Sequence, residues 1–224
     1  GMLGMHGTYE ANWAMNQADL ILAVGVRFDD RVTGRLDAFA PNSTKIQIDI
    51  DRASINKTVP VDLPIIGDCG DVLAQLIAAW GNRQAQDLAA WKERIEGWRA
   101  RKSLAYPSRK DVLMPQFAVE RLFELTRHLD PVISSEVGQH QMWAAQYFHF
   151  FGPNRWLTSG GLGTMGYGLP AALGAQLGNP GKLVVDIAGD ASIQMNIQEL
   201  GTATQYRLPV KVFILNNEWM GMVR

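Results

Sequence analysis

The stretch VVDIAGDAS, Val184 to Ser192, decides the fold of the second half of the chain. Its apolar, β-branched start predicts a buried strand over Lys182–Ala188, which Gly189 and Asp190 bring to an end. A helix is expected next, because apolar residues then recur at helical spacing, at Ile193, Ile197 and Leu200. A carboxylate at the tip of a buried strand needs either a helix to cap or a cation to bind.

A second strand, Val210–Leu215, follows the predicted helix and ends at Asn216 and Asn217. A crossover of strand, helix and strand is right-handed and makes the two strands parallel, so Asp190 and Asn217 are expected at one carboxyl edge. The oxygens of an aspartate, an asparagine and a backbone carbonyl together form a site that suits a Mg²⁺ ion bound to a diphosphate.

The start of the predicted helix, at Ala191 and Ser192, offers N–H groups to phosphate oxygens. Each feature also has a plainer explanation, in which Asp190 or Ser192 caps the helix and the two asparagines form a turn. The occurrence of both features in one strand–helix–strand unit favours the site for a metal and a diphosphate.

The first half of the chain alternates helical and strand-like pieces in the same way. β-Branched runs predict parallel strands at residues 19–26, 45–51 and 63–68. Three strands are fewer than an open α/β domain usually has, so this half is expected to be part of a domain. The sequence predicts an α/β fold with two open, mostly parallel sheets flanked by helices. The predicted divisions are a first unit, a polar helical connector and a second unit, at residues 1–80, 81–110 and 111–224.

Composition excludes several classes of function. The 224 residues carry a formal net charge of -1, with 47% hydrophobic and 19% charged residues, so no basic field is present for nucleic acid. No apolar run reaches the roughly 18 residues that a membrane span needs. One cysteine, Cys69, and a start unlike a secretory leader predict a cytoplasmic location.

The motif GDAS followed by NN resembles the thiamine diphosphate motif, Gly-Asp-Gly with a distal Asn-Asn, with Gly189, Asp190 and Asn217 in register. Ala191 departs from the third glycine, yet acetolactate synthases (acetohydroxyacid synthases) typically read Gly-Asp-Ala-Ser. GLGTMGYGLPAALGA, GDASIQMNIQEL, LPVKVFILNN and GMVR are similar to the cofactor domain of that family's catalytic large subunit. GMHGTYEAN, GVRFDDRVTG and IDIDRASINK are similar to its central FAD-binding domain.

This resemblance implies a site for thiamine diphosphate in the second unit. Asp190, Asn217 and the backbone carbonyl of Trp219 would hold Mg²⁺. The implied cofactor-binding residues are Val137, Gly138, Gln139, His140, Gly163, Met165, Gly189, Asp190, Ala191, Ser192 and Asn217. Taken alone, GQH after a strand is also typical of a turn with a surface histidine, and Met165 is equally a core residue.

The resemblance also implies an FAD site in the first unit. Arg27, Asp29 and Arg31 stand at alternate positions after a strand, so they can share one side if the backbone stays extended, although a surface salt-bridge cluster explains them equally well. Aspartates after the later strands could accept ribose hydroxyls or cap helices. The implied FAD residues are Met5, His6, Gly25, Arg27, Asp29, Arg31, Val32, Asp49, Ile50, Asp68 and Cys69.

The reaction implied for the parent enzyme is a transferase reaction of branched-chain amino acid biosynthesis. Pyruvate loses CO₂ and condenses with a second pyruvate or with 2-oxobutanoate. The family's activating glutamate belongs to a domain upstream of Gly1, so no catalytic residue is assigned here and the isolated chain is expected to be inactive. A homo-oligomer and a regulatory small subunit are also implied. The alternatives are another carboligase or decarboxylase of this cofactor class, such as a glyoxylate carboligase, and a non-catalytic scaffold.

Overall fold

The computed structural model describes residues 2–223. They form two compact units that divide between Leu104 and Ala105, and each unit is described by itself. Both units contain a parallel β-sheet with helices, which confirms the predicted α/β fold class. No helix within residues 2–223 is long and apolar enough to cross a membrane.

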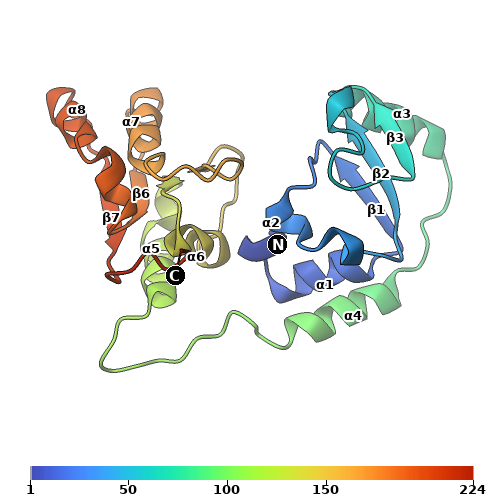
Figure 1. Cartoon of the computed structure of the whole chain (residues 1–224), viewed down its shortest axis with the longest axis horizontal. Helices are drawn as coiled ribbons and strands as arrows, with labels where there is room; N and C mark the ends of the chain where they lie inside the picture. The colour runs from blue at the N-terminus through green and yellow to red at the C-terminus, as the bar shows by residue number, and fades with distance from the viewer. Residues whose placement is uncertain (1, 224) are drawn as a thin grey trace. The chain divides into compact units, whose positions relative to one another are not determined.

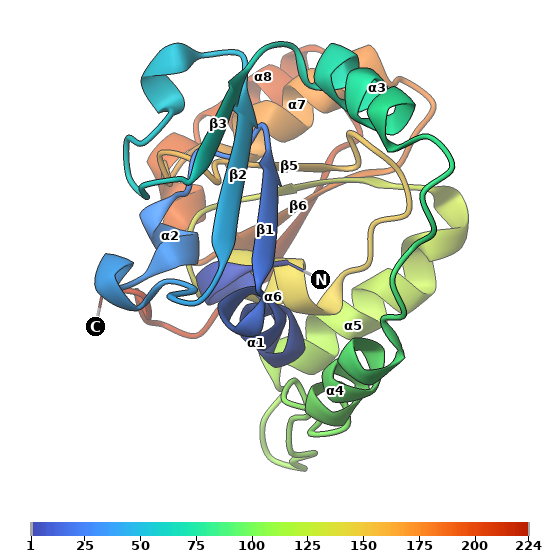
Figure 2. The same cartoon turned by 90° about the vertical axis from the view of Figure 1, so that its right-hand side faces the viewer.

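The first unit is built on a parallel sheet whose strands lie in the order β1-β2-β3. Figure 2 shows these strands side by side in that order. They occupy the places that the β-branched runs predict: β1 (Leu20–Val24), β2 (Thr44–Asp49) and β3 (Leu63–Ile66). Because the strands are parallel and in register, the residues that follow them meet at one carboxyl edge.

Helices and turns surround this first sheet. Met15 of α1 packs against a core that includes Ala23, Phe28 and Phe39, and α4 lies beside α1 (Figure 1). The short helical turns are η1 before β1, η2 between β1 and β2, and η3 between β2 and β3. The helical elements are η1 (Gly4–His6), α1 (Tyr9–Gln17), α2 (Asp30–Thr33), η2 (Leu36–Ala38), η3 (Arg52–Ser54), α3 (Cys69–Trp80) and α4 (Ala89–Arg99).

The second unit is built on a parallel sheet in the order β5-β4-β6-β7. The strands are β4 (Val132–Ser135), β5 (Trp156–Thr158), β6 (Val184–Gly189) and β7 (Lys211–Leu215). Every residue of β4 and β6 is buried, because helices cover both faces of the sheet. The chain runs outward from β4 to β5 and then returns to β6 on the other side of β4. The strand order therefore reverses between β4 and β6, the place where open α/β sheets bind ligands.

Helices α5 and α6 cover one face of this second sheet and α7 covers the other. Val119 and Phe123 of α5 pack with Ile133 and Ile187, whereas Ala172 of α7 packs with the opposite face. Pro115 begins α5, a position where its missing N–H costs nothing. The helical elements are α5 (Pro115–Thr126), η4 (Arg127–Leu129), α6 (Gln139–Tyr147), α7 (Gly168–Gly178), η5 (Ser192–Asn196) and α8 (Glu199–Gln205).

The segment after Asp190 differs from the continuous helix that the apolar spacing predicts. Ser192–Asn196 forms a 3₁₀ helix, and the α-helix begins only at Glu199. Ile193 and Ile197 still recur at the predicted spacing, but the side chain of Ser192 bonds back to Gly189 and tightens the first turn. The predicted crossover between two parallel strands is confirmed.

Candidate functional site

A cavity of about 230 Å³ opens at the carboxyl ends of β4, β6 and β7, beside the reversal of strand order. Its walls contain every residue for which the sequence predicts a thiamine diphosphate or metal role in this unit: Val137, Gly138, Gln139, His140, Gly163, Met165, Gly189, Asp190, Ala191, Ser192, Asn217 and Trp219. These residues come from four separate segments of the chain. The fold thus brings the predicted set together, while its role in binding stays a prediction.

Asp190 and Asn217 converge as the crossover geometry predicts. The backbone nitrogen of Asn217 lies 3.5 Å from Oδ1 of Asp190. The side chain of Asn217 points into the same region, where its Nδ2 lies 3.4 Å from Oε1 of Gln139 and its Oδ1 accepts a hydrogen bond from the nitrogen of Trp219. A carbonyl oxygen has two lone pairs, so Oδ1 of Asn217 retains the capacity to bind a cation.

The imidazole of His140 fills the space between two glycines at the base of this cavity. A Cβ on Gly138 would lie 2.5 Å from Cε1 of His140, and one on Gly189 would lie 2.7 Å from its Nδ1. Oγ of Ser192 lies 3.3 Å from Nε2 of the same ring. Burial lowers the pKa of His140 to about 4, against the opposing effects of the Glu136 backbone and the Asp190 charge. His140 is therefore a neutral, packed group at ordinary pH.

Several residues of this region were not predicted from the sequence. Leu215, Trp143 and residues 220–223 also line the cavity. Two carboxyl groups, Glu136 and Asp186, are fully buried behind it. An acidic residue inside an apolar strand run, as in VISSEV and VVDIAG, is a signal that could have identified both.

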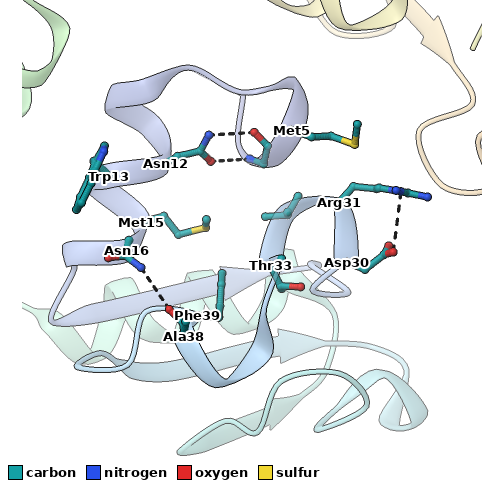
Figure 3. Close-up of a pocket in the computed structure, with 13 residues that line it drawn as sticks. Met5, Asn12, Trp13, Met15, Asn16, Asp30, Arg31, Thr33, Ala38 and Phe39 are labelled. Carbon is teal, nitrogen blue, oxygen red and sulfur yellow. Dashed lines mark hydrogen bonds and ion pairs between the residues drawn. The ribbon is translucent and has the colours of Figure 1, made fainter. Parts of the chain in front are cut away.

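The first unit contains a cavity of about 550 Å³ between η1, α1, α2 and the segment that follows α2. Figure 3 shows Met5 and Arg31 at this cavity, together with Trp13, Met15 and Phe39. Of the predicted FAD residues, Met5, Arg31 and Val32 line the cavity. The side chain of Asn12 forms two hydrogen bonds with the backbone of Gly4 and so fixes η1 against α1.

Except for His6 in η1, the other predicted FAD residues lie at or after the strand ends. Gly25 follows β1 with a positive φ of 62°, and a Cβ at this position would lie 3.6 Å from Sγ of Cys69 at the start of α3. Asp68 caps α3 by accepting hydrogen bonds from the nitrogens of Gly70 and Asp71. The helix-capping explanation of Asp68 is therefore confirmed. His6 is the last residue of η1, Asp49 is the last residue of β2, and Ile50 follows it.

Arg27, Asp29 and Arg31 do not follow one extended strand. Asp29 caps the short helix α2 by accepting from the nitrogen of Arg31, and it forms an ion pair with Arg27. Phe28 between them has a positive φ of 52°. Because Arg31 lies inside α2, the prediction that an extended backbone places the three side chains on one side is wrong. The ion-pair explanation accounts for Arg27 and Asp29.

Comparison with known proteins agrees with the geometry of both units. A thiamine pyrophosphate (that is, diphosphate) enzyme central domain matches residues 1–76, and a C-terminal domain that binds thiamine pyrophosphate matches residues 136–224. The first unit thus matches the central domain of thiamine pyrophosphate enzymes, and the second unit matches their C-terminal domain.

Within this family the chain corresponds to a segment of the acetolactate synthase large subunit. It is 53% identical to the acetolactate synthase isozyme 3 large subunit of Escherichia coli, over all of this chain and 40% of that protein. It is 50% identical to the large subunit of Haemophilus influenzae and 51% identical to that of Parasynechococcus marenigrum, covering 39% and 36% of those proteins. The chain therefore spans about two fifths of the length of these relatives.

Proposed function

We propose that the second unit binds the diphosphate of thiamine diphosphate through Mg²⁺, as part of an acetolactate synthase. The observation that carries this proposal is the 3.5 Å approach of Asn217 to Asp190 at neighbouring strand ends, inside one cavity with Gly138 and Gln139. The matched thiamine pyrophosphate domain supports the choice of ligand.

The residues present fit a magnesium–diphosphate group. Residues 2–223 hold no cluster of three or more His, Cys, Asp or Glu, so a cation here would take one carboxylate, neutral oxygens and the diphosphate itself. In that part of the chain no lysine or arginine forms an ion pair with Asp190. Asp190, Oδ1 of Asn217 and the carbonyl of Trp219 are the proposed ligands.

The protein's own groups would bind and orient the cofactor. Bound thiamine diphosphate supplies the carbanion chemistry of 2-oxo acid condensation. Asp190 and Asn217 would anchor its charged end, His140 would close the base of the cavity as a neutral ring, and Met165 would contact it from the cavity wall. The apolar side chains of Trp143, Leu215 and Met220 also line the cavity and would exclude water from a bound ligand.

Isothermal titration calorimetry of the chain with thiamine diphosphate and Mg²⁺ tests this proposal. We expect saturable heat that requires both components and is lost in Asp190→Asn, because the neutral amide removes the charge that holds the cation. The matched control is Asp111→Asn, which changes a solvent-exposed aspartate paired with Arg109. A silent titration of the unsubstituted chain would favour a scaffold that binds no cofactor.

We further propose that the first unit contributes to an FAD site. Met5, Arg31 and Val32 line one cavity, and Gly25 and Cys69 meet at the carboxyl edge of the sheet. Quenching of flavin fluorescence on titration with the chain tests this, with Arg31→Gln expected to weaken it. Arg35→Gln is the matched control, since Arg35 is exposed and paired with Asp37. Equal quenching by all three proteins, or none, would contradict the assignment.

For the whole protein we propose condensation of pyruvate with pyruvate or 2-oxobutanoate, carried out in the cytoplasm by a homo-oligomer. The relatives are named large subunits, which is the reason to propose a smaller regulatory partner as well. Product analysis with pyruvate and with glyoxylate, on a large subunit that contains this chain, separates this activity from that of a glyoxylate carboligase. Sedimentation of the same protein with and without a candidate small subunit tests both assemblies.

A further inference from the structure

Glu136 is a fully buried carboxylate directly behind the cavity of the second unit. It follows β4, and its backbone nitrogen continues the sheet by donating to the carbonyl of Ile187 at 3.0 Å. Its side chain lies on the face that α7 covers, because Ser134 two residues earlier bonds to Asp186 on that face. The carboxylate faces the start of α7 and does not line the cavity.

Three backbone N–H groups bind this carboxylate. Oε2 accepts from Gly166 at 2.6 Å, and Oε1 accepts from Gly168 at 2.8 Å and Leu169 at 3.2 Å. Burial raises the pKa of Glu136, and these hydrogen bonds act in the opposite direction. The N-terminus of an eleven-residue helix adds a favourable dipole, which offsets part of the cost of burying the charge.

Gly166 is bound from its other side as well. Its carbonyl accepts a hydrogen bond from Nδ2 of Asn196 at 2.6 Å, and its φ is 94°. Glu136 and Asn196 thus fix both polar groups of one residue. Met165, which lines the cavity, immediately precedes Gly166, and a Cβ on nearby Gly163 would lie 3.9 Å from the side chain of Val137.

Gly168 and Asp186 show how closely this arrangement is packed. A Cβ on Gly168 would overlap Oδ1 of Asp186 and would lie 2.8 Å from Cγ of Glu136. Both buried carboxyl groups therefore lie close to Gly168, a position that leaves no room for a side chain. Glu136 has little freedom to move away from the amides that it binds.

We propose that Glu136 is a positioning residue that, together with Asn196, fixes the Gly163–Met165 wall of the cavity for the thiamine portion of the cofactor. The proposal rests on thiamine diphosphate being the ligand. In the proposed site, Asp190 and Asn217 bind the diphosphate end from other strands. The wall that Glu136 holds would therefore contact the organic part of the ligand. A wall that is already ordered saves the cost of ordering it on binding.

The test compares two ligands on the same proteins by calorimetry: Mg²⁺ with thiamine diphosphate, and Mg²⁺ with inorganic pyrophosphate. In Glu136→Gln the side-chain NH₂ group must face at least one of the backbone N–H groups that bind the carboxylate. At least one of these hydrogen bonds is therefore lost. We expect binding of thiamine diphosphate to weaken about tenfold, as for the loss of one buried hydrogen bond, with pyrophosphate binding unchanged.

Asn196→Ala removes the other hydrogen bond to Gly166 at a less buried position. We expect the same selective loss of thiamine diphosphate binding, so the test stays valid if Glu136→Gln fails to fold. Glu124→Gln is the control, because Glu124 is half-exposed and paired with Arg121 on α5. Circular dichroism and thermal unfolding establish that each variant is folded. Equal loss for both ligands, or unchanged binding of both, would overturn the positioning role. Failure of the unsubstituted chain to bind thiamine diphosphate would instead overturn the proposed function, and this inference with it.

Discussion

His140 and Gly189 are in direct contact at the base of the cavity, where a Cβ on Gly189 would lie 2.7 Å from Nδ1 of the imidazole. We predict that Gly189→Ala lowers the free energy of unfolding by about 1–3 kcal/mol, the usual cost of overpacking, because His140 is buried and cannot move aside. Urea denaturation measures the change.

The matched control is Gly174→Ala in the interior of α7, where a Cβ meets no atom within 4 Å among the described residues. Alanine favours a helix interior, so we expect this variant to gain about 0.5–1 kcal/mol. If both alanine variants shift stability in the same direction, the contact between Gly189 and His140 is not what makes glycine necessary there.

Ser192→Ala removes a buried hydroxyl from the turn after β6. Oγ of Ser192 accepts from the nitrogen of Gly189 at 3.1 Å and bonds to its carbonyl at 3.2 Å. We predict a loss of about 1 kcal/mol in unfolding free energy, since a buried N–H is left without this partner. Ser108→Ala, at an exposed position, should stay within about 0.5 kcal/mol of the unsubstituted protein. Equal melting temperatures for the two variants would refute the prediction.

The raised pKa of the buried Asp186 carboxyl group predicts a specific pH dependence of the free energy of unfolding. Burial raises its pKa to about 7, with a smaller contribution from the Glu136 charge, against the hydrogen bond from Ser134. The folded state therefore holds a proton that the unfolded chain has released above about pH 4. Protonated Asp186 therefore makes its full contribution to the free energy of unfolding below about pH 4, and this contribution is lost as the pH rises toward 7.

Asp186→Asn imitates the protonated form at every pH. The difference in unfolding free energy, variant minus unsubstituted protein, should grow between about pH 4 and pH 7 by no more than about 1.4 kcal/mol per pH unit and then level off. Guanidinium denaturation at a series of pH values measures it. Curves that stay parallel over this range would show that Asp186 is ionised in the folded protein.

Gly221→Ala should affect binding more than folding. A Cβ on Gly221 would overlap Oε1 of Gln139, whose flexible side chain can shift at little cost. The shift moves Gln139 away from Asn217, so we predict weaker binding of Mg²⁺ and thiamine diphosphate, by about threefold to tenfold, with stability changed by less than about 0.5 kcal/mol. A large drop in melting temperature would contradict this separation.

The sequence predicts the elements that position the candidate site. The β-branched runs identify β1 to β3, and the crossover rule places Asp190 and Asn217 at one sheet edge. Both predictions succeed because they depend on regular features, namely strand periodicity and crossover handedness, which distant parts of the chain do not alter.

The features that the sequence did not predict depend on tertiary packing. Strand β5 is only the three residues Trp156–Thr158, too short for a periodic pattern, and it forms by pairing with β4. The Arg27–Asp29 segment turns at Phe28 because Asp29 caps α2, a local competition that alternation ignores. Glu136 matches no motif, and its role follows from amides thirty residues away.

The cavity of the second unit draws its walls from the loops after β4, β6 and β7 and from the turn before α7, so it exists only when distant parts of the chain have met. Such long-range pairing forms slowly and late in folding. A ligand of this cavity consequently recognises the completed unit rather than any partly folded one, and raising its concentration should shift the melting temperature of the whole unit upward.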